Sequence, residues 1–180
     1  MTRLMCCIFF ASLLTMLGAC TERVQPHAII LERQTIAERL VDSLMSDFHF
    51  TRSQAAGIVG NLAQESGQFH TLQEVGGDCY GYSQWCGVRK REFNDFARDN
   101  GRPGSFSANY GFLRYEMRRD YPDMIEDIRN VGSVETSAEI FMKVFLRPNA
   151  RLANLPRRIV YARSYDAGNF QGSASSLVVR

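Results

Sequence analysis

The sequence has little net charge, few histidines and no internal repeat. Its 180 residues contain 21 Lys and Arg against 19 Asp and Glu, a formal net charge of +2. Proteins that bind nucleic acid usually carry a strong basic excess, so this balance argues against a nucleic-acid partner. The three histidines, His27, His49 and His70, are scattered without the spacing of metal ligands. We therefore expect neither a metal site nor a cofactor.

Long apolar runs are also lacking, except at the N-terminus. Residues 4–17, which follow Arg3, are mostly apolar. This run is short for a membrane-spanning helix, which needs about 20 residues, and has the length of a signal-peptide core. It closes on two small residues and Cys20, which resembles a bacterial lipoprotein signal. We predict a signal peptide over residues 1–19 and lipidation of Cys20, with an ordinary cleaved secretory signal as the alternative.

The residue after Cys20 bears on the destination of the protein. Thr21 stands where an inner-membrane retention signal usually has Asp, which favours the outer membrane. Each acyl chain adds roughly 0.8 kcal/mol of membrane binding per buried methylene, so several chains hold a protein firmly. We therefore expect a protein anchored in the bacterial cell envelope, on the periplasmic face of the outer membrane.

Cysteine is scarce, and its distribution indicates an oxidising compartment. Of five cysteines, two leave with the predicted signal peptide and Cys20 takes the lipid. Cys79 and Cys86 remain, and a disulfide between them would close a short loop around residues 81–85. A metal site is the rival interpretation, but these two thiols have no nearby histidine.

The apolar pattern of the mature chain predicts a mainly α domain over residues 35–168. A tether over residues 20–34 precedes it, and a flexible tail over residues 169–180 follows. Residues 67–87 are rich in glycine and predict a loop or small β-hairpin, so the domain has a small irregular or β lobe. Apolar residues recur at helical spacing in seven segments, about 36–48, 51–66, 88–100, 106–117, 122–128, 133–147 and 155–165.

The second of these helices carries several local signals. Thr51 and Gln54 fit a capping box at its start, and Gly67 suits a left-handed residue after its end. Gly57 and Gly60 lie inside it, where each glycine costs roughly 0.5–1 kcal/mol relative to alanine. This cost suggests that another helix packs very close to that face.

The same helix ends with a candidate catalytic acid, Glu65. At 100° per residue, Glu65 falls at the edge of the face that carries Ile58 and Leu62. Partial burial and the negative end of the helix dipole both favour a protonated carboxyl, which a general acid needs. The alternatives are an exposed acid at a helix end or an ion pair with Arg89 or Arg91.

The order of these motifs resembles a known family. Residues 54–62, then Glu65-Ser66-Gly67, then Gly81-Tyr82-Ser83-Gln84-Trp85 and Arg89, are similar to the phage tail lysozyme family. That family belongs to the lysozyme-like superfamily, with goose-type lysozymes and soluble lytic transglycosylases. The resemblance covers about residues 36–167 and implies a mainly helical, lysozyme-like fold. It implies a muramidase that cleaves the β-1,4 bond between N-acetylmuramic acid and N-acetylglucosamine in peptidoglycan glycan strands, with Glu65 as the acid.

The resemblance also suggests residues that contact the substrate. Gln84 would line the cleft and hydrogen-bond the sugar, while Tyr82 and Trp85 offer flat rings for stacking. For Trp85 the alternative is a core residue that anchors the loop. Arg89 would order the cleft by pairing with an acid, or else lies on a solvated helix face.

A second carboxylate is less well defined. Glu74 lies nine residues after Glu65, the spacing that phage-type lysozymes use, and is the first candidate catalytic partner. Asp78, inside the predicted disulfide loop, is the other candidate and a predicted substrate contact. Either acid would equally cap a loop. If neither serves, the substrate's own 6-hydroxyl can attack and give a 1,6-anhydro sugar, which is the lytic transglycosylase outcome.

Other classes of function remain as alternatives. Residues 51–62 superficially resemble a DNA-binding helix-turn-helix, but a secreted, nearly neutral chain disfavours it. Ser66 has no histidine near it in sequence and suits a helix end better than a nucleophile. The serious rival is a lipid-anchored protein that binds peptidoglycan without cutting it. A tethered muramidase would also suit an envelope-spanning secretion machinery, as a local opener of the wall.

Overall fold

The chain folds into a mainly α domain, as the sequence predicts. The computed structural model describes residues 34–151 and 153–172. In order, the helices of these residues are α2 (Ile36–Phe48), α3 (Arg52–Glu65), α4 (Gly87–Asn100), α5 (Phe106–Asp120), α6 (Pro122–Arg129), α7 (Val134–Phe141), a π-helical turn η1 (Met142–Leu146) and α8 (Leu155–Asp166). None of these described helices is long and apolar enough to cross a membrane.

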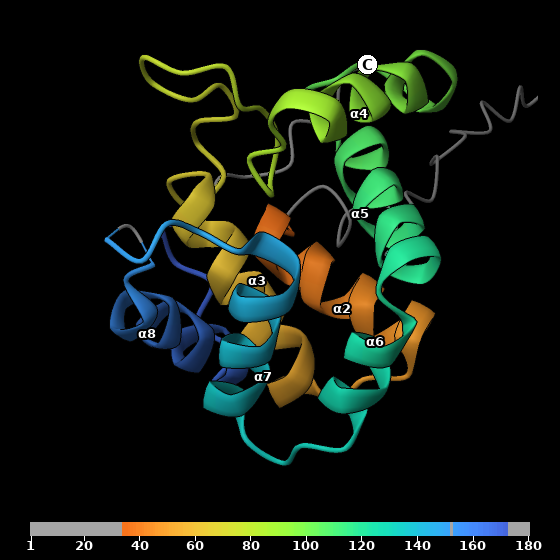
Figure 1. The fold of residues 1–180 in the computed structure, drawn as a ribbon. Helices are drawn as coiled ribbons and strands as arrows, with labels where there is room; N and C mark the ends of the chain where they lie inside the picture. Colours follow the sequence, from red (N-terminus) through yellow and green to blue (C-terminus); the bar gives the residue numbers. More distant parts are fainter. Residues whose placement is uncertain (1–33, 152, 173–180) are drawn as a thin grey trace, which may run out of the picture.

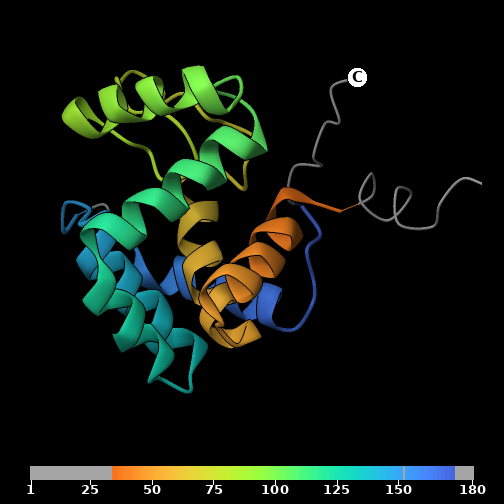
Figure 2. The ribbon, with the colours of Figure 1, turned by 90° about the vertical axis from the view of Figure 1, so that its right-hand side faces the viewer.

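Helix α3 lies at the centre of the larger part of the domain. It packs against α2, α7 and α8 (Figure 1). Helix α4 and the loop of residues 66–86 form a smaller part at the top of both views, and α5 runs from α4 down to α6 (Figure 2). One buried hydrophobic cluster joins the two parts, because it includes Ile58 and Leu62 of α3 together with Phe93 and Phe112.

Local side chains define where the helices begin. Thr51 accepts a hydrogen bond from the Gln54 N–H, and the Gln54 side chain accepts one from the Thr51 N–H, which confirms the predicted capping box. Thr35, Ser105 and Ser133 cap α2, α5 and α7 by accepting a single hydrogen bond each. These bonds satisfy backbone donors that a helix N-terminus leaves without intrahelical partners.

The two glycines inside α3 permit close helix packing, which the sequence predicted from their unfavourable effect on helix stability. A Cβ on Gly57 would lie 2.6 Å from Ser137 Oγ of α7, and a Cβ on Gly60 would lie 2.6 Å from the Ala162 nitrogen of α8. Both distances are shorter than carbon contacts allow, so the three helices approach to a spacing that only glycine tolerates. Gly67, with φ of 53°, adopts the predicted left-handed conformation after the helix.

Two expectations concern irregular segments. For residues 66–86 the structure shows the loop and not the β-hairpin, because the segment has no strand and its β pairing consists of isolated bridges from Tyr80 to Gln73 and Trp85. The predicted flexible tail is wrong at Phe170, whose ring stacks on Tyr165 and packs against the core. The predicted signal peptide, the tether up to residue 33, Cys20 and the tail beyond residue 172 lie outside the described residues.

Candidate active site

Glu65 is the last residue of α3, and its side chain is 20% exposed. Its Oε1 lies 2.7 Å from Nη2 of Arg158 on α8. The ion pair that the sequence allowed for Glu65 therefore exists, but its partner is neither Arg89 nor Arg91. No described residue donates a well-angled hydrogen bond to this oxygen, so charge attraction dominates the contact. The carboxyl is thus held from one side while a fifth of the side chain meets solvent.

Arg158 is a charged residue of the core, with 1% exposure. Its Nε donates to the Ala153 carbonyl at 2.6 Å, and its Nη1 donates to the Asn61 carbonyl and side-chain oxygens at 3.4 and 3.3 Å. Asn61 in turn donates to the Gly57 and Ala138 carbonyls at 2.9 Å. Sequence reasoning missed Arg158, because nothing in its local sequence marks it as a partner of α3.

Gln84 has a role inside the loop. Its backbone is left-handed, with φ of 49°. Its side-chain nitrogen donates to the Leu72 carbonyl at 2.9 Å and to the Gly81 carbonyl at 2.8 Å. Gln84 was expected to hydrogen-bond the sugar, but its side-chain nitrogen instead holds the loop together.

Tyr82 and Trp85 are core residues, which corrects their predicted stacking on sugar rings. Tyr82 is 1% exposed and Trp85 is fully buried. The Tyr82 ring packs edge-on against Phe69, and the Trp85 indole stacks on Phe93 at a centroid distance of 4.9 Å. Neither ring presents a face to a ligand. Of the two interpretations of Trp85, the loop anchor is the one the structure shows.

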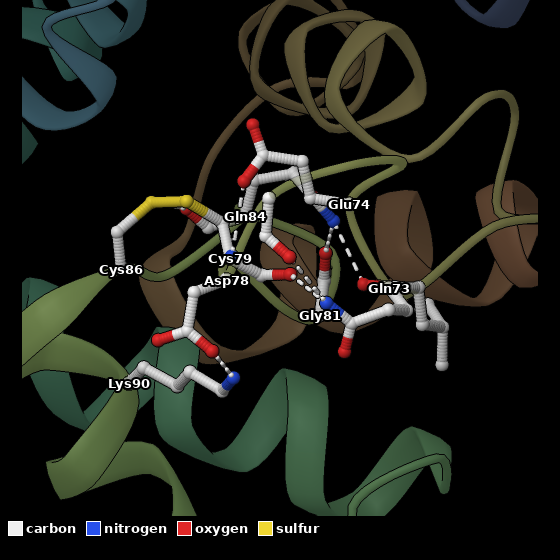
Figure 3. The surroundings of a disulfide bond; sticks show 10 residues. Gln73, Glu74, Asp78, Cys79, Gly81, Gln84, Cys86 and Lys90 are labelled. Atoms are coloured by element: carbon white, nitrogen blue, oxygen red, sulfur yellow. Dashed lines mark hydrogen bonds and ion pairs between the residues drawn. A yellow bond between two sulfur atoms is a disulfide. The ribbon is translucent and has the colours of Figure 1, made fainter.

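The predicted disulfide between Cys79 and Cys86 is present (Figure 3), and it closes the end of the loop just before α4 begins. Glu74 lies beside it, exposed, and its Oε2 accepts a 3.1 Å hydrogen bond from the Cys79 N–H. Glu74 and both sulfurs lie within 4.8 Å of one another, but cysteines joined in a disulfide offer no thiolate to a metal. This cluster is therefore a structural feature of the loop.

Asp78 points away from Glu74 toward α4 (Figure 3). Its Oδ1 lies 2.6 Å from Nζ of Lys90, and its side chain is 86% exposed. An ion pair this exposed contributes little stability. The geometry does not bring Asp78 and Glu74 together as a pair of carboxylates.

Arg89 pairs with an acid, as one interpretation expected, but that acid is Glu116 of α5. The Nε–Oε1 and Nη2–Oε2 distances are 2.5 and 2.9 Å. The Glu116 side chain is 2% exposed and also accepts a 2.8 Å hydrogen bond from Trp85 Nε1. Arg89 thus fixes the loop and α4 to α5, a role that the sequence did not reveal because Glu116 carries no local signal.

The comparison with known families decides the identity of the fold. The sequence model of the phage tail lysozyme family matches residues 35–167. The chain belongs to the phage tail lysozyme family. No curated protein and no solved structure shows a significant match to it. The matched residues include all the described helices, so the fold is lysozyme-like. Membership of this family implies a glycoside hydrolase that acts on peptidoglycan.

Glu65 does not line either of two surface hollows of this lysozyme domain. One is lined by residues of α4 and α5 that include Phe96, Tyr115 and Arg119. The other lies where α2 meets α6, around His49 and Arg129. The second hollow also contains the carboxylates of Asp47 and Glu126, but neither hollow is lined by Glu65, Glu74 or Asp78.

Proposed function

We propose that this lysozyme domain cleaves the β-1,4 bond between N-acetylmuramic acid and N-acetylglucosamine, with Glu65 as the general acid. The observation that carries the proposal is the placement of Glu65. It ends the helix that holds the family's motif, and its carboxyl is anchored on one side and partly open on the other. A proton donor for a glycosidic oxygen needs this combination of fixed position and access.

The reaction requires Glu65 to hold a proton when the glycan is bound. The proton then passes to the glycosidic oxygen as the bond to the N-acetylmuramic acid carbon breaks. Glu65 is left as a carboxylate, a form that the neighbouring Arg158 stabilises.

The group that acts together with Glu65 in the reaction determines which products form. Hydrolysis needs a second carboxylate as base or nucleophile, and Glu74 remains the candidate for that role. Its Oε2 is engaged by the loop backbone, and Asp78 is paired with Lys90. These contacts favour a second candidate reaction, lytic transglycosylation, in which the 6-hydroxyl of N-acetylmuramic acid replaces the second carboxylate. Mass spectrometry of the released muropeptides distinguishes the two reactions, because hydrolysis gives reducing ends and transglycosylation gives 1,6-anhydro ends.

The assignment of the acid is tested with Glu65→Gln, assayed for release of fragments from purified sacculi. We expect no detectable lysis and unchanged binding to sacculi by a folded protein with a lower melting temperature, because the substitution leaves the buried Arg158 without its counter-ion. Glu126→Gln is the matched control, because it makes the same chemical change at an exposed acid of α6 and should leave lysis intact. Full activity of Glu65→Gln would rule out the acid. A wild-type protein that binds sacculi and releases nothing would favour the non-enzymatic alternative, a peptidoglycan-binding lipoprotein.

We further propose that a lipid on Cys20 anchors the enzyme on the periplasmic face of the outer membrane. The support is the sequence pattern of residues 1–20 and the need of a wall-cutting enzyme for access to peptidoglycan. An envelope-spanning secretion machinery is the proposed context, in which local opening of the wall is useful. Cell fractionation of Cys20→Ala tests the anchor: the variant should leave the membrane fraction, and retention there would contradict the proposal.

A further inference from the structure

Arg158 is placed where an arginine is unfavourable for the helix that carries it. It lies in the first turn of α8, which begins at Leu155. The positive end of the helix dipole repels a cation there, and burial to 1% exposure removes its hydration. Apolar residues of similar volume often replace buried charges without loss of stability. The position of Arg158 therefore calls for a reason other than the stability of the fold.

Three contacts fix the orientation of the guanidinium. The Ala153 carbonyl accepts from Nε, and the backbone and side-chain oxygens of Asn61 accept from Nη1. Because the guanidinium is planar, these contacts also fix the position of Nη2, which lies 2.7 Å from Oε1 of Glu65. Nη2 therefore cannot move away from Glu65 unless Arg158 breaks its hydrogen bonds to Ala153 and Asn61.

The spacing along α3 explains why this contact is possible. Asn61 and Glu65 are four residues apart, so both lie on the face of α3 that meets α8. Gly60 lets α8 approach closely, since a Cβ there would lie 2.6 Å from the Arg158 carbonyl oxygen. Asn61 is itself held by the Gly57 carbonyl of α3 and the Ala138 carbonyl of α7. The glycine–asparagine–glutamate pattern of this helix therefore forms one unit that ends at the acid.

We propose that Arg158 is a positioning residue for the reaction, which holds the Glu65 carboxyl in the orientation from which it protonates the glycosidic oxygen. This inference rests on the proposed function of Glu65. Arg158 acts through Glu65 and does not touch the substrate. Its rigid support by Asn61 and Ala153 limits the carboxyl to a narrow range of positions, and a misplacement of about 1 Å can cost on the order of 10²-fold in rate.

The test measures kcat and KM on soluble glycan strands for Arg158→Met, Arg158→Gln and Arg158→Lys, each in the full-length protein. We expect kcat to fall on the order of 10²-fold for Met and Gln, with KM and binding to sacculi within about twofold of wild type. Lys keeps the charge but lacks the planar fork, so its kcat should lie between those of Met and wild type. Arg157→Met, an exposed neighbour on the same helix, is the matched control and should keep wild-type kcat.

The outcomes separate positioning from a structural role. If Arg158 only tied α8 to α3, variants that fold would show a lower melting temperature and wild-type kcat. A folded Arg158→Met or Arg158→Gln variant with kcat within about twofold of wild type overturns the inference, as does a rise in KM with kcat unchanged. Failure of the proposed function looks different, because the wild type would then release nothing or Glu65→Gln would retain activity.

A measurement that leaves Arg158 intact covers the case in which its variants do not fold. The probe is a crystal structure of Glu65→Gln with a bound tetrasaccharide of alternating N-acetylglucosamine and N-acetylmuramic acid. Nη2 of Arg158 should lie within hydrogen-bond distance of the side-chain oxygen of the substituted amide. The amide nitrogen should face the glycosidic oxygen. An Arg158 that has turned away, or that contacts the sugar directly, would overturn the inference.

Discussion

Trp85 donates a 2.8 Å hydrogen bond from its indole nitrogen to Oε2 of the buried Glu116. The same carboxylate accepts two hydrogen bonds from Arg89. One acid of α5 therefore holds the tryptophan of the loop and the arginine of α4. Because Glu65 leads directly into this loop, the arrangement also limits how the loop can move relative to the candidate acid.

Replacement of Glu116 should destabilise the domain. Glu116→Gln removes one half of a buried charge pair and leaves Arg89 without its counter-ion, which costs roughly 3 kcal/mol in free energy of unfolding. Urea denaturation of the variant measures the loss. Glu92→Gln is the matched control, since Glu92 pairs with Arg119 at 2.8 Å in an exposed position and should change stability by less than about 1 kcal/mol. Equal losses in both variants would contradict a special role for burial.

Alanine at the two helix glycines should force α3 away from its neighbours. In Gly57→Ala the new Cβ meets the Ala138 nitrogen at 2.8 Å, and in Gly60→Ala it meets backbone atoms of α8 at 2.6 Å. Overpacking costs about 1–3 kcal/mol, which exceeds the roughly 0.5–1 kcal/mol that alanine contributes to a helix. Both variants should therefore melt at lower temperature. Gly132→Ala, whose Cβ would have no neighbour within 4 Å, should not.

Loss of the disulfide should loosen the loop. The bond joins residues seven apart, and closure of a loop this short stabilises the folded state by roughly 2–3 kcal/mol in the chain-entropy description. Cys79→Ser should therefore lower the melting temperature under non-reducing conditions. Adding a reductant should lower that of the wild type in the same way and leave the variant unchanged. If the melting temperature of the wild type did not change on adding reductant, the disulfide would contribute no stability.

Asp47 should make stability depend on pH in the acid range. Burial raises its pKa, but the hydrogen bond from Tyr110 and the charges of Arg114 and Arg118 outweigh burial, so the pKa lies below its ordinary 3.8. A depressed pKa contributes stability that is present above 3.8 and is lost as the pH falls through the lower folded-state value. Asp47→Asn should therefore show a weaker decline of stability on acidification, followed by urea denaturation at several pH values.

Asp99→Asn is a suitable control for that experiment. Asp99 is an exposed acid of α4, and its replacement keeps the overall charge equal to that of Asp47→Asn. The control should retain the wild-type decline of stability with falling pH. If both variants followed the same curve, the pH dependence would not arise from the contacts of Asp47.

Local signals predicted the helices well because their causes are local. The capping box at Thr51 and the left-handed Gly67 each involve atoms a few residues apart, so the sequence contains all the information needed. The glycines of α3 carried a less direct signal. Their cost indicated a close neighbour, and the structure identifies α7 and α8 as the helices that use the space.

The substrate contacts were predicted less well. Tyr82 and Trp85 are residue types that suit a sugar platform, but exposure depends on which helices cover them. Phe69 and Phe93 take up the contacts that a sugar was expected to make. The role of Gln84 could not be predicted from sequence for the same reason, because the partners of its amide are carbonyls of the folded loop.

By itself, the sequence determined the helical class, the approximate positions of the helices, the disulfide and the position of Glu65 at a helix end. These properties follow from short-range hydrogen bonding, helical periodicity and the motif of residues 54–67. Only the tertiary structure decided that Arg158 meets Glu65 and that Glu116 holds Trp85. A buried charge finds its partner through the packing of whole helices, and that geometry leaves no mark on the residues next to it in the chain.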